Sequence, residues 1–288
     1  VGSDNDEHRG AMKDIRGRNA ILTGATRGIG VYIARALAEE GVNLTLAARS
    51  QSELEQDRSE MEALGDRAIA TECDVLEPAD RARLLERTES ELGPIDILVN
   101  NAGIERVRRF EEATEADFTD TLAINLEAPI LLTRAVVPGM LERKRGHVVN
   151  IASGAGKVGV PYGTSYCASK HGLVGFTNAL RAEYHSSPVG FSVVCPGFVT
   201  DAGMYDRWEQ QGIKAPSVAG SSKPEKVASV TISCIRKNRA EVIVNTPPVR
   251  PLVVIANIAP GLVPRLMKTF GYTGVFERVI AAEETDQH

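Results

Sequence analysis

The stretch LTGATRGIG (residues 22–30) places three glycines between a short apolar run and a longer amphipathic one. Glycines in such a turn let the backbone approach a pyrophosphate, and the amide groups at the start of the next helix point at the same anion. A plain strand-to-helix turn gives a similar pattern, so the motif alone is weak. Its place after the first apolar run favours a dinucleotide site. We expect these residues to border the dinucleotide: Gly24, Thr26, Arg27, Gly28, Ile29 and Gly30.

Short apolar runs alternate with amphipathic runs along most of the chain. The apolar runs predict seven strands, over residues 19–24, 42–48, 67–75, 95–103, 146–153, 189–197 and 240–245. The amphipathic runs predict helices over residues 29–40, 51–64, 78–92, 115–143, 165–184 and 224–237. Near-continuous Val, Ile and Leu in the strands is typical of parallel sheets that are buried on both faces. The pattern therefore predicts an α/β protein with a Rossmann-type, doubly wound parallel sheet of seven strands flanked by helices.

The 288 residues, 43% of them hydrophobic, are enough for a large core. No linker composition or internal repeat interrupts the alternation, so we expect a single Rossmann-type domain over residues 18–248. Residues 1–17 are polar and are expected to be a disordered or tag-like lead-in. Residues 249–288 form an apolar extension, which we expect to pack on the same domain or on a partner subunit.

Charge and composition exclude several classes of protein. The net charge is −5 and no long basic stripe is present, so nucleic acid is not an expected partner. The four cysteines form no CxxC pair and indicate a reducing compartment. The scattered histidines form no metal-binding pair, so no metal is expected. Without a signal peptide or a run of about 18 apolar residues, the sequence favours a cytoplasmic location.

The end of the second predicted strand indicates which dinucleotide binds. Arg49 lies 19 residues after Gly30, where an Asp or Glu binds the ribose 2′-hydroxyl in NAD-binding folds, and no acid stands beside it. Arg27 and Arg49 suit a 2′-phosphate through charge-assisted bonds, so NADP(H) is expected over NAD(H), although two solvated arginines are the plainer alternative. Asp74 is suited to bind the adenine amino group, or equally to cap its loop. These residues complete the expected adenosine subsite: Arg49, Ser50, Asp74 and Val75.

Tyr166 and Lys170 are four residues apart on one predicted helix and therefore share one face. A tyrosine has an ordinary pKa near 10, which makes it a poor acid or base at neutral pH. A neighbouring ammonium favours the phenolate and is expected to lower that pKa. The phenol could then exchange a proton with a carbonyl or alcohol oxygen. YxxxK alone is common, and an ordinary helix pair is the alternative.

Further residues place this pair in a site. Ser153 follows the fifth predicted strand, where its hydroxyl could polarise a substrate oxygen, and NNAG (residues 100–103) ends the fourth. Asn125 lies among apolar residues of the long helix and needs a polar partner. It could hold a water that relays protons to Lys170, or it could mark a kink. Residues expected at the cofactor also include Asn101, Ala102, Gly103, Pro196, Gly197 and Val199.

Taken together, these motifs resemble the short-chain dehydrogenase/reductase family over roughly residues 18–245. The matching pieces are TGATRGIG, CDV, NNAG, Asn125, Ser153, the YxxxK pair and the Pro-Gly of residues 196–197. The resemblance implies a seven-stranded Rossmann-type domain and hydride transfer with a nicotinamide cofactor. It implies Tyr166 as general acid/base, Ser153 as binder of the substrate oxygen, Lys170 as the group that lowers the tyrosine pKa, and Asn125 in a proton relay. Dimers or tetramers are usual in that family.

One departure from the family pattern concerns PGFVTDAG (residues 196–203). Family members often read PGxVxT, with a threonine on the nicotinamide carboxamide. Here Thr200 comes one residue early and Asp201 takes its place, so the threonine role is open and Asp201 could cap the next helix. We read residues 200–222 as a substrate lid with Met204, Tyr205 and Trp208 as its apolar lining, and a surface loop with one buried aromatic is the equally weighted alternative. The expected substrate contacts are Ser153, Val160, Tyr162, Tyr166, Met204 and Trp208.

The tail over residues 247–280 is apolar, interrupted by prolines and dotted with arginines. We expect it to pack on a subunit or cover the site, with a lipid surface as the less favoured alternative. An apolar tail suggests a lipophilic ketone as substrate. The leading function is an NADP(H)-dependent carbonyl reductase, with a 3-oxoacyl thioester reductase as a subclass. The alternative from another class is a catalytically idle NADP-binding regulator, against which the complete Ser–Tyr–Lys–Asn set argues.

Overall fold

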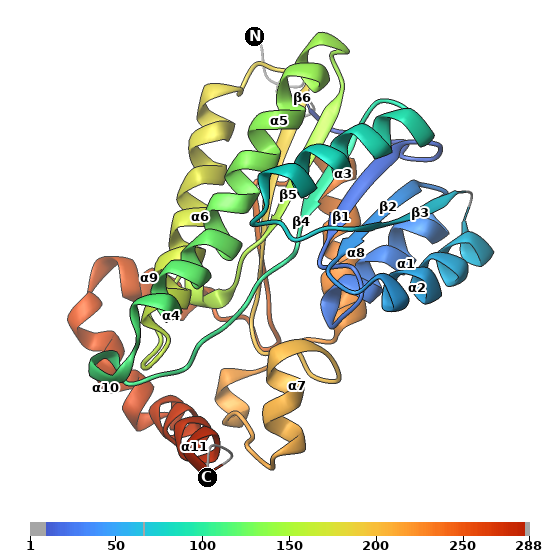
Figure 1. Ribbon diagram of the computed structural model, residues 1–288. Coiled ribbons are helices and arrows are strands. Elements are labelled where there is room, and N and C mark those ends of the chain that lie inside the picture. The colour runs from blue at the N-terminus through green and yellow to red at the C-terminus, as the bar shows by residue number, and fades with distance from the viewer. Residues whose placement is uncertain (1–9, 66, 286–288) are drawn as a thin grey trace, which may run out of the picture.

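A single parallel sheet organises the chain (Figure 1). The structure, a computed structural model, describes residues 10–65 and 67–285. The strands lie in the order β3-β2-β1-β4-β5-β6-β7. Their bounds are β1 Asn19–Thr23, β2 Asn43–Ala48, β3 Ala68–Glu72, β4 Ile97–Asn100, β5 Gly146–Ile151, β6 Val189–Pro196 and β7 Glu241–Val244. The predicted doubly wound, seven-stranded fold is confirmed.

The strand order reverses between β1 and β4, and this reversal positions the site. Ala20 of β1 pairs with Leu44 of β2 on one side and with Ile97 of β4 on the other. The connections that leave β1 and β4 run to opposite faces of the sheet, so a crevice opens beyond their carboxyl ends. A ligand site is therefore expected where Thr23 and Asn100 end their strands.

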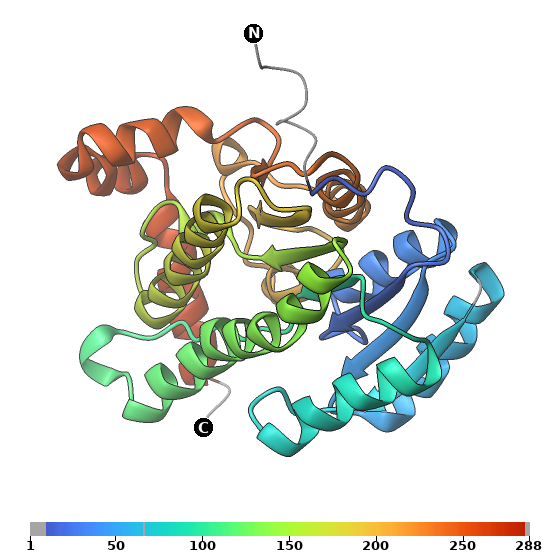
Figure 2. The same cartoon turned by 90° about the horizontal axis from the view of Figure 1, so that it is seen from above.

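Helices cover both faces of the sheet (Figure 2). On one face, α1 (Ile29–Glu39), α2 (Gln51–Leu64) and α8 (Pro224–Lys237) bury apolar side chains such as Leu37, Leu54 and Ile235 against the strands. On the other face lie α3 (Pro78–Glu91), α5 (Ala128–Glu142) and α6 (Thr164–Glu183), which contribute Leu84 and Leu173 to the core. Burial on two faces explains why the strands are apolar throughout rather than alternating.

The helix α4 (Glu115–Leu122) runs through a π-helical turn, Ala123–Glu127, into α5 without a break. This continuous helix, Glu115–Glu142, is long and apolar enough to cross a membrane by length and composition alone. Its apolar side chains Leu132, Val137 and Met140 are instead buried in the core against the sheet. The run is thus apolar because it is a core helix of the domain.

Residues 10–17 differ from the predicted lead-in. The Met12 amide donates to the Ile235 carbonyl at 3.0 Å, and the side chains of Met12 and Ile15 are buried in the main core. These residues belong to the domain because their apolar side chains fill space between α1 and α8. The remainder of the predicted lead-in, residues 1–9, lies outside the described residues.

The C-terminal extension forms three helices, α9 (Arg250–Ile258), α10 (Val263–Thr269) and α11 (Tyr272–Thr285). Val275, Phe276 and Val279 of α11 pack on Tyr205 and Trp208 of the helix α7 (Gly203–Gln210). The extension therefore packs on its own chain, beside the carboxyl edge of the sheet (Figure 1). Neither α7 nor the three extension helices was predicted.

Candidate active site

A cavity of about 1260 Å³ lies at the carboxyl ends of the strands. The loops after β1, β2, β3 and β4 line one half of it, and residues after β5 and β6, with α7 and the extension, line the other. Most residues that we predicted to bind cofactor line this cavity: Gly24, Thr26, Arg27, Gly28, Ile29, Arg49, Ser50, Asp74, Val75, Asn101, Ala102, Gly103, Tyr166, Lys170, Pro196, Gly197 and Val199. Gly30 does not line it.

The role of Gly30 is to let the turn close. A Cβ at Gly30 would lie 2.0 Å from the Gly24 carbonyl oxygen, so any other residue would open the loop. Gly24 has a φ of +64°, and a Cβ there would lie 2.8 Å from the Cα of Ala102. The glycines thus bring backbone rather than side chains to the cavity, at the start of α1. This arrangement fits a bound pyrophosphate.

Hydrogen bonds fix the end of β4 against the end of β1. The Thr23 hydroxyl accepts from the amides of Asn101 and Ala102, at 3.0 and 3.1 Å. The Asn101 side chain donates to the Gly24 carbonyl at 2.8 Å. These bonds fix the glycine loop and the NNAG segment against each other, so the two motifs together form one side of the cavity.

The end of the cavity that we expect to bind adenosine contains an acid that the sequence analysis missed. Glu53, in the first turn of α2, forms an ion pair with Arg27 at 3.1 Å and lines the cavity beside Arg49. Both partners are exposed, so the pair is held weakly. Asp74 accepts from the Leu76 amide at 3.0 Å, which is the loop-capping contact weighed from the sequence.

Three predicted catalytic side chains meet at the centre of the cavity. Tyr166 and Lys170 lie on one face of α6, with the Lys170 ammonium 5.7 Å from the centroid of the Tyr166 ring. Lys170 is buried and donates to the Ile151 carbonyl at the end of β5, at 3.0 Å. Ser153, just past β5, accepts from the Ala155 amide at 3.1 Å. The end of β5 therefore holds both the lysine and the serine in place.

The predicted lowering of the tyrosine pKa is wrong for this structure. Burial and the nearby Glu105 carboxylate raise the pKa of Tyr166, and the hydrogen bond with Ser153 only partly offsets them. Burial also lowers the pKa of Lys170 to about 8. Both groups thus start in forms that can give up a proton, the phenol and the ammonium.

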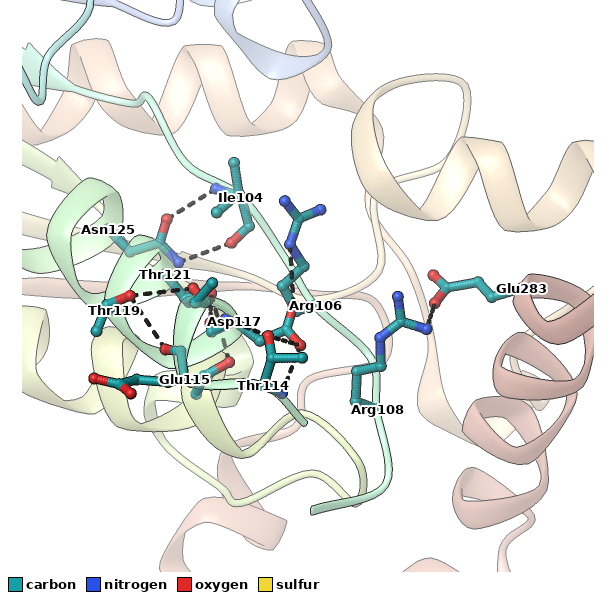
Figure 3. A network of polar contacts seen from close by, with 12 residues as sticks. Ile104, Arg106, Arg108, Thr114, Glu115, Asp117, Thr119, Thr121, Asn125 and Glu283 are labelled. Carbon is teal, nitrogen blue, oxygen red and sulfur yellow. Dashed lines mark hydrogen bonds and ion pairs between the residues drawn. The ribbon is translucent and has the colours of Figure 1, made fainter. Parts of the chain in front are cut away.

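Asn125 lies in the π-helical turn and is fully buried, but it does not line the cavity. Its side chain accepts from the Ile104 amide and donates to the Ile104 carbonyl, both at 2.8 Å (Figure 3). It also donates to the Ser169 hydroxyl of α6 at 3.1 Å. These contacts meet the need for polar partners and fix the segment after NNAG beside α6. The proton relay stays a prediction.

Glu105 is a cavity residue that the sequence analysis missed. Burial raises the pKa of its carboxyl to about 7, with Arg207 opposing the shift and Glu283 adding to it. It directly follows the Ile104 that Asn125 holds, so its position is fixed by the same bonds. Nearby, Arg108 pairs with Glu283 of α11 at 3.3 Å and ties the extension to this segment (Figure 3). The sequence did offer a signal for Glu105, because this charged residue lies two positions after the predicted cofactor motif NNAG.

The apolar wall of the cavity is only partly as predicted. Val160, Met204 and Trp208 line it, and so do residues of the extension: Leu252, Val253, Met267, Tyr272 and Phe276. Tyr162 does not line the cavity, because its backbone has a φ of 62° and its hydroxyl donates to Glu277 at 3.4 Å. That geometry turns the ring toward α11.

Thr200 and Asp201 also lie outside the cavity lining. Asp201 does not cap α7, whose N-cap is Ala202, but forms an ion pair with Lys223. The Thr200 amide instead donates to the Ser222 carbonyl at 3.2 Å. These contacts hold the loop after β6 closed, and neither residue contributes to the cavity.

The fold and the site define a class: a doubly wound α/β protein with a glycine loop, a serine, a tyrosine and a lysine at the crevice beyond the carboxyl ends of its strands. The sequence model of the short chain dehydrogenase family matches residues 18–212. The chain belongs to the short-chain dehydrogenase/reductase family, as predicted.

Similar proteins match between 76% and 90% of this chain. The ketoacyl reductase HetN of Nostoc sp. is 40% identical over 265 residues, 90% of this chain and 91% of that protein. The oxidoreductase UcpA of Escherichia coli is 36% identical over 220 residues, 76% of this chain and 79% of that one. The actinorhodin polyketide ketoreductase, solved as a variant with NADPH, has a TM-score of 0.74 at 32% identity, over 82% of this chain and 97% of its own. A metagenomic short-chain oxidoreductase with NADP has a TM-score of 0.69 at 32% identity, over 80% and 98%.

Proposed function

We propose that this protein transfers a hydride between NADP(H) and a carbonyl or alcohol substrate, with Tyr166 as general acid/base. One observation carries the proposal: Ser153, Tyr166 and Lys170 line the same cavity as the glycine loop. A dinucleotide regulator needs the glycine loop but has no use for a buried phenol next to a buried ammonium. The catalytically idle alternative is therefore the less favoured one.

The nicotinamide supplies or accepts the hydride, and the side chains handle the oxygen and the proton. In the reductive direction, Ser153 donates a hydrogen bond to the substrate oxygen, and Tyr166 donates its proton to that oxygen as negative charge develops. Lys170, with a pKa of about 8, then returns a proton to the tyrosine. In the oxidative direction the same protons move in reverse.

NADP(H) is proposed as the preferred cofactor because Arg27 and Arg49 border the cavity where a 2′-phosphate would lie. The relatives that carry the names ketoacyl reductase and polyketide ketoreductase support a 3-oxoacyl thioester as the substrate class. The apolar wall made by α7 and the extension supports a lipophilic chain on that substrate. A cytoplasmic location and a dimeric or tetrameric assembly complete the proposal.

The test is the oxidation of NADPH by purified protein with ketones, aldehydes and 3-oxoacyl thioesters, and with NADH in parallel. Replacing Tyr166 by Phe should reduce kcat by about 10²–10⁴-fold while the affinity for NADPH is kept, because the phenol only moves a proton. Turnover by the parent chain that Tyr166→Phe leaves unchanged would contradict the catalytic role. Tight NADPH binding without turnover in either direction would support the idle regulator.

A further inference from the structure

The helix α9 is apolar, and only its inner side, with Leu252, Val253 and Ile255, packs against the rest of the described chain. Its sequence is RPLVVIANI, and among the α-helices of the described residues it alone has no buried residue. Apolar helices in water normally bury at least one face. With α10 it projects from the edge of the molecule, away from the sheet (Figure 2). The outer side of α9 is therefore exposed despite its apolar composition.

Exposed large apolar side chains concentrate on this segment. Val254 is 53% exposed and Ile258 is 79% exposed, and the two are four residues apart on the outer side of α9. Leu262 and Phe270 follow, at 42% and 47%. Half of the eight exposed large apolar side chains in the described part of the chain thus fall within residues 254–270. We call these four residues the outer face.

The charge of the same segment has one sign. No Asp or Glu occurs between Glu241 and Glu277, whereas Arg250, Arg265 and Lys268 all lie there and are exposed. The chain as a whole has a net charge of −5. A basic segment in an acidic protein is complementary to an anionic surface.

The inner side of the segment belongs to the substrate half of the cavity. Leu252 and Val253 of α9 line the cavity together with Met267 of α10 and Tyr272. Their contacts with Val158 and Val160 hold α9 in place from that side. A partner bound to the outer face would therefore be separated from the cavity only by the helix α9.

We propose that the outer face and its basic residues bind the surface of an anionic lipid bilayer. Apolar side chains beside exposed Lys and Arg are the combination that interfacial helices use. Together α9 and α10 are long and apolar enough to cross a bilayer, but the pair is bent by 117°, so we place the segment along the surface of the bilayer rather than across it. A second copy is the weaker occupant, since a two-fold interface would place the three cations of one chain near those of the other.

The experiment is vesicle flotation of the full-length protein, without substrate or cofactor, so its result does not depend on the proposed function. The protein should float with vesicles of phosphatidylcholine and phosphatidylglycerol and far less with phosphatidylcholine alone. The double change Val254→Glu with Ile258→Glu should reduce binding at least about tenfold. Arg265→Gln with Lys268→Gln should reduce it about thirtyfold, from roughly 1 kcal/mol per charge.

Matched controls separate the outer face from general effects. Leu64→Glu changes an exposed apolar residue on α2, and Lys226→Gln with Lys237→Gln removes two exposed cations from α8. Both controls should bind vesicles like the parent. The proposal is overturned if the parent does not float with anionic vesicles. It is also overturned if the control variants lose as much vesicle binding as the outer-face variants. A third contrary outcome is that the protein is a dimer that does not bind vesicles and that Ile258→Glu converts to a monomer.

Discussion

At the scale of single residues, Glu105 makes the sharpest prediction. Its carboxyl has a pKa of about 7, and its negative charge raises the pKa of Tyr166. Glu105→Gln removes that charge, so the phenolate that alcohol oxidation requires should form at lower pH. We expect the rising limb of the kcat/KM profile for oxidation with NADP⁺ to move to lower pH, with a rate gain of a few-fold near neutrality.

Glu283→Gln is the matched control for Glu105. Glu283 raises the pKa of Glu105 and is not among the groups that shift Tyr166. Its removal should therefore change the profile less than Glu105→Gln does. Superimposable profiles for the parent and Glu105→Gln would show that the carboxyl does not act on the tyrosine.

The two arginines of the adenosine end predict cofactor selectivity. Arg27→Ala or Arg49→Ala removes a cation that can bind a 2′-phosphate, so each should weaken NADPH binding by about 10- to 100-fold and NADH binding little. Glu53→Gln frees Arg27 from its ion pair and should strengthen NADPH binding. Fluorescence titration with both cofactors measures this. An equal loss for NADH and NADPH would assign the arginines to another role.

The position of a single residue in the site could be predicted where that residue belongs to a local sequence motif. Tyr166 and Lys170 share a helix, and Ser153 follows a strand, and the resemblance that joins these motifs placed all three in one site. Glu53 on α2 was missed because only the folded sheet brings that helix to the cavity, whereas Glu105 was missed although it lies two residues after NNAG. Tyr162 was misplaced because a positive φ turns its ring away, and no spacing rule signals that.

At the scale of elements, the π-helical turn between α4 and α5 is the clearest case. Asn125→Ala would leave the Ile104 amide and carbonyl without their partner, which should cost about 2–4 kcal/mol of the free energy of unfolding. The kcat should fall as well, because Glu105 follows Ile104. Urea denaturation and steady-state kinetics measure the two effects.

Asn257→Ala is the control for that substitution. Asn257 is exposed on α9 and makes a single bond to the Val253 carbonyl, so its removal should change stability by less than about 0.5 kcal/mol. If both alanine variants unfold at the same urea concentration as the parent, the turn does not depend on Asn125.

The strands and the six flanking helices were predicted to within a few residues, because doubly buried strands leave long apolar runs. The helix α7 and the three extension helices were not predicted, since glycine and proline interrupt their patterns. These helices pack on one another through contacts between residues far apart in the sequence. The rings of Trp208 and Phe276, 68 residues apart, have centroids 5.6 Å from each other.

At the scale of the whole molecule, His147 predicts the response to acid. It is fully buried between the Gly10 carbonyl, at 3.0 Å, and the Ser192 hydroxyl, at 2.9 Å, and burial lowers its pKa to about 4. The unfolded chain takes up this proton near pH 6.5 and the folded chain only near 4. Stability should therefore fall by about 3 kcal/mol as the pH drops between these values, and level off below.

His147→Gln should flatten this acid response, because glutamine does not titrate. The free energy of unfolding measured from pH 7 to 4 gives the comparison, and His185→Gln, an exposed histidine, is the control. An unchanged slope for His147→Gln would mean that other groups cause the loss.

The contribution of the extension to the substrate half of the cavity has a consequence for how such proteins diverge. The glycine loop, the residues proposed to bind adenosine and the three proposed catalytic side chains all lie within residues 18–212, the segment that the family shares. The extension adds apolar residues to the substrate half of the cavity, and Glu283 of α11 lines the cavity as well. Selection can therefore alter the tail to change which molecule is admitted while the inherited chemistry stays intact, and a graft of this tail onto a shorter relative should transfer preference without transferring mechanism.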